Sequence, residues 1–171
     1  MLRKWLFLAF ALGFSTPAFS SEIVMELIPD AKIVGEGRLS VVFLDIYDAT
    51  LYAPEGKLLD SKPYALSIRY MREIEGQDIA DRSVQEMRGQ GVVDNAKLAA
   101  WNAQMKAIFP DVQDGTVLSA VFIPKQKTIF YEGGEQIGII NDAEFTQLFS
   151  DIWLGEKTSE PDLRRKLLGL S

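Results

Sequence analysis

The chain has 171 residues and a formal net charge of −6, and it contains neither cysteine nor histidine. These absences exclude thiolate metal sites, nucleophilic thiols and a Ser-His-Asp triad, and they remove the commonest zinc ligand and the usual general base. An acidic chain without a basic run is also a poor candidate for binding nucleic acid or anionic membrane surfaces. We therefore expect no metal, no cofactor and no nucleic-acid partner.

The first 20 residues have the layout of a secretory signal peptide. A short basic start precedes the apolar run 5–14, which is shorter than the roughly 20 residues that a spanning helix needs. Ala18-Phe19-Ser20 then places small residues where a signal peptidase cuts. We expect a signal peptide over 1–20, one mature domain over 21–171, no transmembrane span after cleavage, and a periplasmic or secreted location. The alternative is a retained membrane anchor.

Strand patterns come first in the mature chain. Runs of β-branched, aromatic and alternating apolar residues predict strands over 23–28, 32–34, 39–43, 45–52 and 64–71. The period then changes to that of a helix. Apolar residues spaced three or four apart predict helices over 78–88 and 95–109, which end at a Gly-Gln-Gly segment and before Pro110.

The second half repeats this order of strands followed by helices. Strands are predicted over 116–123, 127–131 and 136–140, with hairpin turns at 124–126 and 132–135. A helix capped by Asn141 or Asp142 ends at Gly155, and a last short helix runs through Leu168. Because strands and helices are segregated rather than alternating, the fold class is α+β, an antiparallel sheet packed with helices.

Four segments resemble, in order, landmarks of the chalcone isomerase superfamily. They read Gly-Glu-Gly-Arg at 35–38, Ile-Tyr-Asp-Ala-Thr-Leu-Tyr at 46–52, Ile-Glu-Gly-Gln-Asp-Ile-Ala-Asp-Arg-Ser at 74–83, and Trp-Leu-Gly-Glu-Lys-Thr-Ser-Glu-Pro-Asp-Leu at 153–163. The resemblance is nearest to the bacterial exported branch called chalcone isomerase-like. It implies an antiparallel sheet wrapped by helices over a cleft. That cleft holds a flavonoid in the plant enzymes and a fatty acid in the fatty-acid-binding branch.

The resemblance also assigns positions to the catalytic groups of the enzymes. The arginine that stabilises the attacking oxygen corresponds to Arg38, with a one-residue shift in the loop, and the first threonine corresponds to Tyr47. The catalytic tyrosine of the enzymes corresponds to Ile79 and their asparagine to Glu86. The threonine or serine that lies late in their sequence corresponds to Ile152. An isoleucine cannot donate a hydrogen bond, and losing one oxyanion donor can cost about 100–1,000-fold in rate. The resemblance therefore implies a cleft that holds a guest without efficient isomerase chemistry.

Three hypotheses on function follow. The first is a non-catalytic protein that binds an apolar anion such as a fatty acid, with Arg38 as counter-charge and Tyr47, Ile79 and Ile152 as further ligand-binding residues. The second is an isomerase, an intramolecular lyase acting on chalcone-like or other enone substrates, with Arg38, Tyr47 and Glu86 as catalytic candidates. The third is a protein-interaction module of the cell envelope.

Each charged candidate also has a purely structural interpretation. Arg38 can pair with Glu36 or Asp45 at the surface, and Glu86 can be a solvated charge on a helix. If Glu86 instead faces an apolar cleft, it can act as a general base. The sequence sets neither the oligomeric state nor the identity of the ligand.

Overall fold

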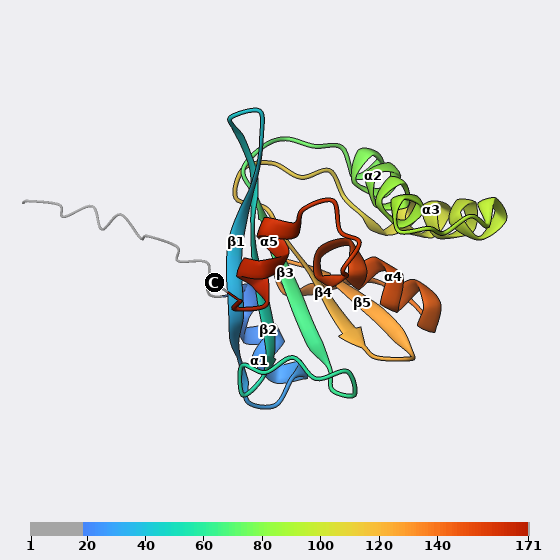
Figure 1. Ribbon diagram of the computed structural model, residues 1–171. Coiled ribbons are helices and arrows are strands. Elements are labelled where there is room, and N and C mark those ends of the chain that lie inside the picture. The colour runs from blue at the N-terminus through green and yellow to red at the C-terminus, as the bar shows by residue number, and fades with distance from the viewer. Residues whose placement is uncertain (1–18, 171) are drawn as a thin grey trace, which may run out of the picture.

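The computed structural model describes residues 19–170, and residues 1–18, most of the predicted signal peptide, lie outside the described residues. The strands are β1 (Ala31–Val41), β2 (Leu44–Pro54), β3 (Tyr64–Tyr70), β4 (Val117–Ile123), β5 (Lys127–Glu132) and β6 (Glu135–Ile140). The helices are α1 (Phe19–Leu27), α2 (Gly76–Gly89), α3 (Asn95–Ile108), α4 (Ala143–Leu154) and α5 (Pro161–Leu167). Each strand pairs antiparallel with the next one along the chain, in a single sheet of order β1-β2-β3-β4-β5-β6 (Figure 1). The predicted α+β class is confirmed.

The sheet is covered on both faces. Leu66 and Ile68 of β3 belong to the main core, which the sheet shares with α2, α3, α4 and α5. Ala65, which points the other way, belongs to a smaller core formed with α1. Every residue of β3 except Arg69 is consequently buried, as expected for a central strand with apolar layers on both sides.

The strand predicted over 23–28 is wrong, because these residues lie in or directly after α1. Val24 and Ile28 are four residues apart, and both are fully buried on the back of the sheet. The run is apolar enough to fit either period. The burial of Val24 and Ile28 together fits a helix, which puts positions i and i+4 on one face, and not the alternation of a strand.

The two strands predicted over 32–34 and 39–43 are parts of one strand, β1, which continues through 35–38. Glycine weakens the sequence pattern of a strand, so Gly35 and Gly37 made the middle of β1 unrecognisable as a strand. Both glycines lie under α5. A Cβ at Gly37 would stand 2.8 Å from the Leu163 side chain, and one at Gly35 would overlap backbone carbonyl oxygens of α5. The glycines therefore let α5 pack directly on β1.

The helix predicted after Asn141 or Asp142 is α4, and Asp142 is its N-cap. The Asp142 carboxylate accepts hydrogen bonds from the backbone N–H groups of Glu144, at 2.8 Å, and Phe145, at 3.0 Å. It also accepts one from the indole N–H of Trp101 in α3, at 3.0 Å. Although burial acts to raise it, these bonds hold the pKa of Asp142 below its usual value. One carboxylate thus starts α4 and ties it to α3.

Among residues 19–170, no helix combines the length and the apolar character needed to cross a bilayer.

Candidate functional site

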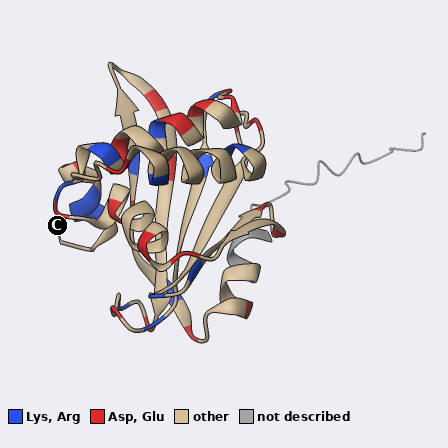
Figure 2. Ribbon diagram, turned by 90° about the vertical axis from the view of Figure 1, so that its right-hand side faces the viewer, with Lys and Arg blue, Asp and Glu red and all other residues tan. Residues whose placement is uncertain are grey.

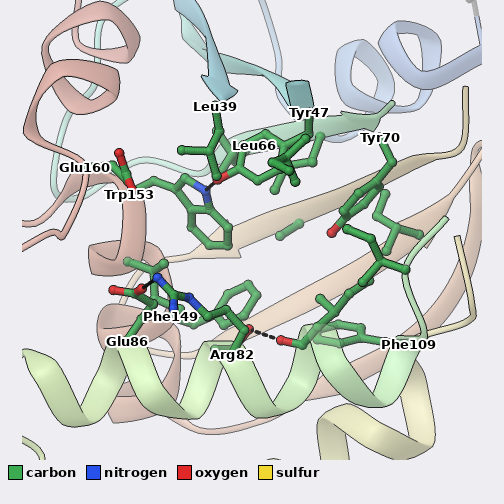
Figure 3. A pocket seen from close by; sticks show the side chains of 18 of the residues that line it. Leu39, Tyr47, Leu66, Tyr70, Arg82, Glu86, Phe109, Phe149, Trp153 and Glu160 are labelled. Carbon is green, nitrogen blue, oxygen red and sulfur yellow. Dashed lines mark hydrogen bonds and ion pairs between the residues drawn. The ribbon is translucent and has the colours of Figure 1, made fainter. Parts of the chain in front are cut away.

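A cavity of about 480 Å³ lies between the sheet and the helices α2 and α4 (Figure 3). This volume falls in the range of roughly 300–1,000 Å³ that is typical of small-molecule sites. Its walls are mainly hydrocarbon, supplied by the sheet, by α2 and by α4. The apolar lining includes Leu39, Leu66, Ile68, Ile79, Phe149 and Ile152.

Tyr47 and Trp153 close one side of the cavity. The indole N–H of Trp153 donates to the Tyr47 hydroxyl oxygen at 2.9 Å, which joins α4 to β2. Burial raises the pKa of Tyr47 to about 12, the hydrogen bond from Trp153 opposing this in part. The phenol therefore stays neutral at physiological pH. Because its oxygen accepts from Trp153, its own O–H remains a donor that can turn toward the cavity.

Tyr70 lies beside Tyr47, with the two ring centroids 6.0 Å apart in an edge-to-face contact. The Tyr70 ring extends from the sheet toward the cavity, as Figure 3 shows. Only 5% of the residue is exposed, and burial raises the pKa of its hydroxyl. None of the other described residues hydrogen-bonds to this hydroxyl. Tyr70 therefore offers an unused donor and acceptor to a guest molecule in the cavity.

Four charged residues line the cavity, and three of them are acidic. Arg82 and Glu86, one turn apart on α2, form an ion pair. The Arg82 side chain is 65% exposed and that of Glu86 only 14% exposed, so Glu86 is the inner partner. Asp78 and Glu160 complete the charged part of the lining. With Arg82 neutralised by Glu86, the remaining charge is negative.

The structure brings four of the five sequence-predicted site residues together. Tyr47, Ile79, Glu86 and Ile152 all line the cavity. Their roles in binding or catalysis stay predictions, because lining a cavity does not establish that a residue contacts a ligand.

Arg38 is the exception, and its expected place at the cleft is corrected by the structure. Its guanidinium is exposed and donates to Asp48, at 2.7 and 3.0 Å, and to Asp45, at 2.9 Å. The next residue along β1, Leu39, does line the cavity. Since successive side chains of a strand point to opposite faces, Arg38 points away from it. The surface pairing with Asp45, one of the two interpretations of this residue, is the one observed.

Sequence reasoning missed Tyr70 and Arg82. Tyr70 was visible only as one apolar position of an alternating strand, and nothing in that pattern separates a cavity wall from a packed core. Arg82 stands four residues from both Asp78 and Glu86, and its spacing is interpreted as an ion pair with Asp78. The structure pairs it with Glu86.

No group of three or more Asp, Glu, Cys or His residues within the part of the chain that the structure describes is placed to hold a metal ion.

Comparison with known proteins decides the family. The model of the chalcone isomerase-like family matches residues 31–169, nearly the whole described domain. The chain belongs to the chalcone isomerase-like family. The resemblance carried by the four sequence segments is thereby confirmed, and the cavity can be considered as that of a chalcone isomerase-like protein.

This chalcone isomerase-like chain is also similar to a curated protein in sequence and to a solved structure in fold. An uncharacterized protein of Haemophilus influenzae is 27% identical over 125 residues, which are 72% of this chain and 61% of that protein. The chain therefore matches about three fifths of the length of this relative. A solved fatty-acid binding protein of Arabidopsis thaliana has a TM-score of 0.63 at 13% identity, over 82% of this chain and 87% of that one. At this identity the likeness shows a shared fold.

Proposed function

We propose that this protein reversibly binds an apolar ligand, such as a fatty acid, in the cavity and does not act as an isomerase. The observation that carries the proposal is the hydrocarbon that Ile79 and Ile152 present to a partly open cavity large enough for a small molecule. Burying apolar ligand surface stabilises a complex by roughly 25 cal/mol per Å². A fold shared with a fatty-acid binding protein supports this proposal. The proposed setting is the periplasm or the cell exterior, which depends on the predicted signal peptide.

The same lining argues against ring-closing chemistry. An isomerase of this superfamily needs several polar donors that stabilise charge developing on the substrate. Positions 79 and 152 supply none, and the arginine expected at the cleft lies outside it in a surface ion pair. Glu86 does face the cavity, but it is held by Arg82. Measurable conversion of chalcone to flavanone by the purified protein would favour the isomerase alternative.

The negative charge of the cavity lining affects whether a fatty acid binds with its head group ionised or protonated. A free carboxylate would meet Glu86, Asp78 and Glu160, whereas the only cation of the described lining, Arg82, is already paired. Tyr47 and Tyr70 instead offer neutral hydroxyl groups. The ligand head group that this cavity suits is therefore uncharged, such as a protonated acid or an alcohol.

Filling the cavity tests the proposed function. Ile79→Trp places a larger ring on the wall, and we expect it to weaken binding of a fluorescent long-chain probe at least tenfold, measured by titration after delipidation. Val93→Trp is the matched control, because Val93 is 83% exposed and does not line the cavity. Equal affinity in wild type and both variants would contradict the proposal, as would the absence of binding to wild type.

A further inference from the structure

The turn between β1 and β2 exposes four consecutive apolar residues, Val41, Val42, Phe43 and Leu44. Phe43 is fully exposed at 101% and Val42 is 80% exposed. We call these four residues the hairpin tip. The hairpin projects beyond the rest of the sheet in Figure 1, and its end, at the top left of Figure 2, carries no charged residue.

The backbone of the hairpin tip does not call for these side chains. Val41 pairs with Leu44, so Val42 and Phe43 form a two-residue turn, with φ of 48° and 66°. Such turns favour Asn-Gly, because both central residues need positive φ. A β-branched residue in this region is an outlier. The sequence thus keeps bulky apolar groups where both the turn geometry and contact with water disfavour them.

A cluster of polar groups lies directly behind the hairpin tip. Arg38 is hydrogen-bonded to Asp48 and Asp45, and the Ser40 hydroxyl donates to Asp45 at 2.6 Å. Asp45, the first charged residue, directly follows Leu44 and is two residues from Phe43, so at about 3.3 Å per residue the apolar end is roughly 7 Å deep before charges begin. Amphipathic helices that lie in the membrane interface bury their apolar face by about 5–10 Å, a depth similar to that of the hairpin tip.

We propose that the hairpin tip inserts into the interfacial region of a lipid bilayer. Its size decides between the possible occupants: a stable protein interface needs about 20–30 residues on each side, whereas the tip is a convex end of four residues. The tip carries no Lys or Arg and the chain is acidic, so the suitable lipid is zwitterionic rather than anionic. Leu39, Val41 and Ile46 of the same hairpin line the cavity. Insertion therefore brings the cavity wall to the membrane, whatever the cavity binds.

A single label tests insertion directly. The chain has no cysteine, so Phe43→Cys can carry one environment-sensitive dye, with Val93→Cys as a control on an exposed apolar residue elsewhere. Phosphatidylcholine vesicles are expected to shift the emission to the blue at position 43 and to leave it unchanged at position 93. Because the dye reports only its own surroundings, membrane contacts of other segments do not imitate the result. No shift at position 43, or equal shifts at both positions, would overturn the proposal.

A double variant separates loss of docking from loss of folding. Val42→Asn with Phe43→Gly installs the favoured turn, so we expect a melting temperature at or above that of wild type. Co-sedimentation with the same vesicles is expected to fall at least about tenfold, since each apolar side chain removed from lipid weakens partitioning by that order. Unchanged co-sedimentation would overturn the proposal. So would a blue shift without vesicles that grows with protein concentration, because it would assign the tip to self-association.

Discussion

The ion pair between Arg82 and Glu86 neutralises the one cation among the described cavity-lining residues, so breaking it tests which form of the ligand head group binds. Glu86→Gln frees the guanidinium of Arg82 while preserving size. Two charges about 4 Å apart interact by about 1 kcal/mol in water and more near protein. We therefore expect affinity for a long-chain carboxylate to rise about tenfold, and affinity for the alcohol of equal chain length to stay unchanged, as measured by titration calorimetry at pH 8.

Glu144→Gln is the control for this variant. It breaks another ion pair, with Lys97 at 2.6 Å, but it is exposed on α4 and does not line the cavity. An equal gain for acid and alcohol in Glu86→Gln, or the same gain in Glu144→Gln, would show that Arg82 does not act on the head group.

At the scale of single residues, the sequence predicted most of the cavity-lining positions correctly but misplaced the one arginine expected there. Tyr47, Ile79, Glu86 and Ile152 came from a resemblance anchored by ordered motifs, and the structure places them all on one cavity. Arg38 came from the same resemblance with a one-residue shift. In a strand, one residue of shift exchanges the two faces of the sheet. No residue-level pattern could settle that shift before β1 and β2 were paired.

At the scale of elements, the contact of α5 with β1 depends on glycine. A Cβ at Gly35 would overlap the carbonyl oxygens of Lys166 and Leu167, which belong to the backbone and cannot turn aside. We expect Gly35→Ala to lower the free energy of unfolding by about 1–3 kcal/mol through overpacking, measured by urea denaturation.

Gly89→Ala provides the opposite expectation in the same assay. Gly89 is in the last turn of α2, and a Cβ there would meet nothing within 4 Å. Alanine there is expected to raise stability by about 0.5–1 kcal/mol, because it reduces the conformational freedom of the unfolded chain. If Gly35→Ala were neutral, the close approach of α5 to β1 would be contradicted.

Most elements could be predicted because their apolar period was unambiguous. The strands after residue 44 and the helices α2 to α5 each have turn or cap residues that mark where they begin and end. The two errors have separate physical causes. The apolar residues of 23–28 fit the spacing of a helix as well as that of a strand. The 35–38 part of β1 contains glycines because α5, which is distant in sequence, packs directly on it. Local pattern alone could not resolve either one.

For the molecule as a whole, burial of tyrosine determines how stability responds to alkali. All five tyrosines have a raised pKa, with burial as the leading cause, and that of Tyr47 rises to about 12. In the unfolded chain a tyrosine ionises near pH 10. The folded state therefore holds protons that the unfolded state loses. The resulting contribution to stability is complete below about pH 10 and is lost as the pH rises through the folded values.

We expect the free energy of unfolding to fall steadily between pH 10 and pH 12 in urea titrations. Tyr70→Phe, which removes a hydroxyl without a hydrogen-bond partner among residues 19–170, should make this fall less steep while leaving the fold intact at pH 7. A wild-type stability independent of pH over this interval would show that the tyrosines are not sequestered in the folded state.

Quenching of Trp153 tests the central claim, an apolar guest inside the cavity. Trp153 lines the cavity, whereas Trp101 is buried away from it beside Asp142. A bromine-labelled fatty acid is expected to quench the indole fluorescence of the delipidated protein, saturating at one ligand per chain. Trp101→Phe should keep this quenching and Trp153→Phe should lose it. No quenching in wild type, or equal quenching in Trp153→Phe, would contradict the account.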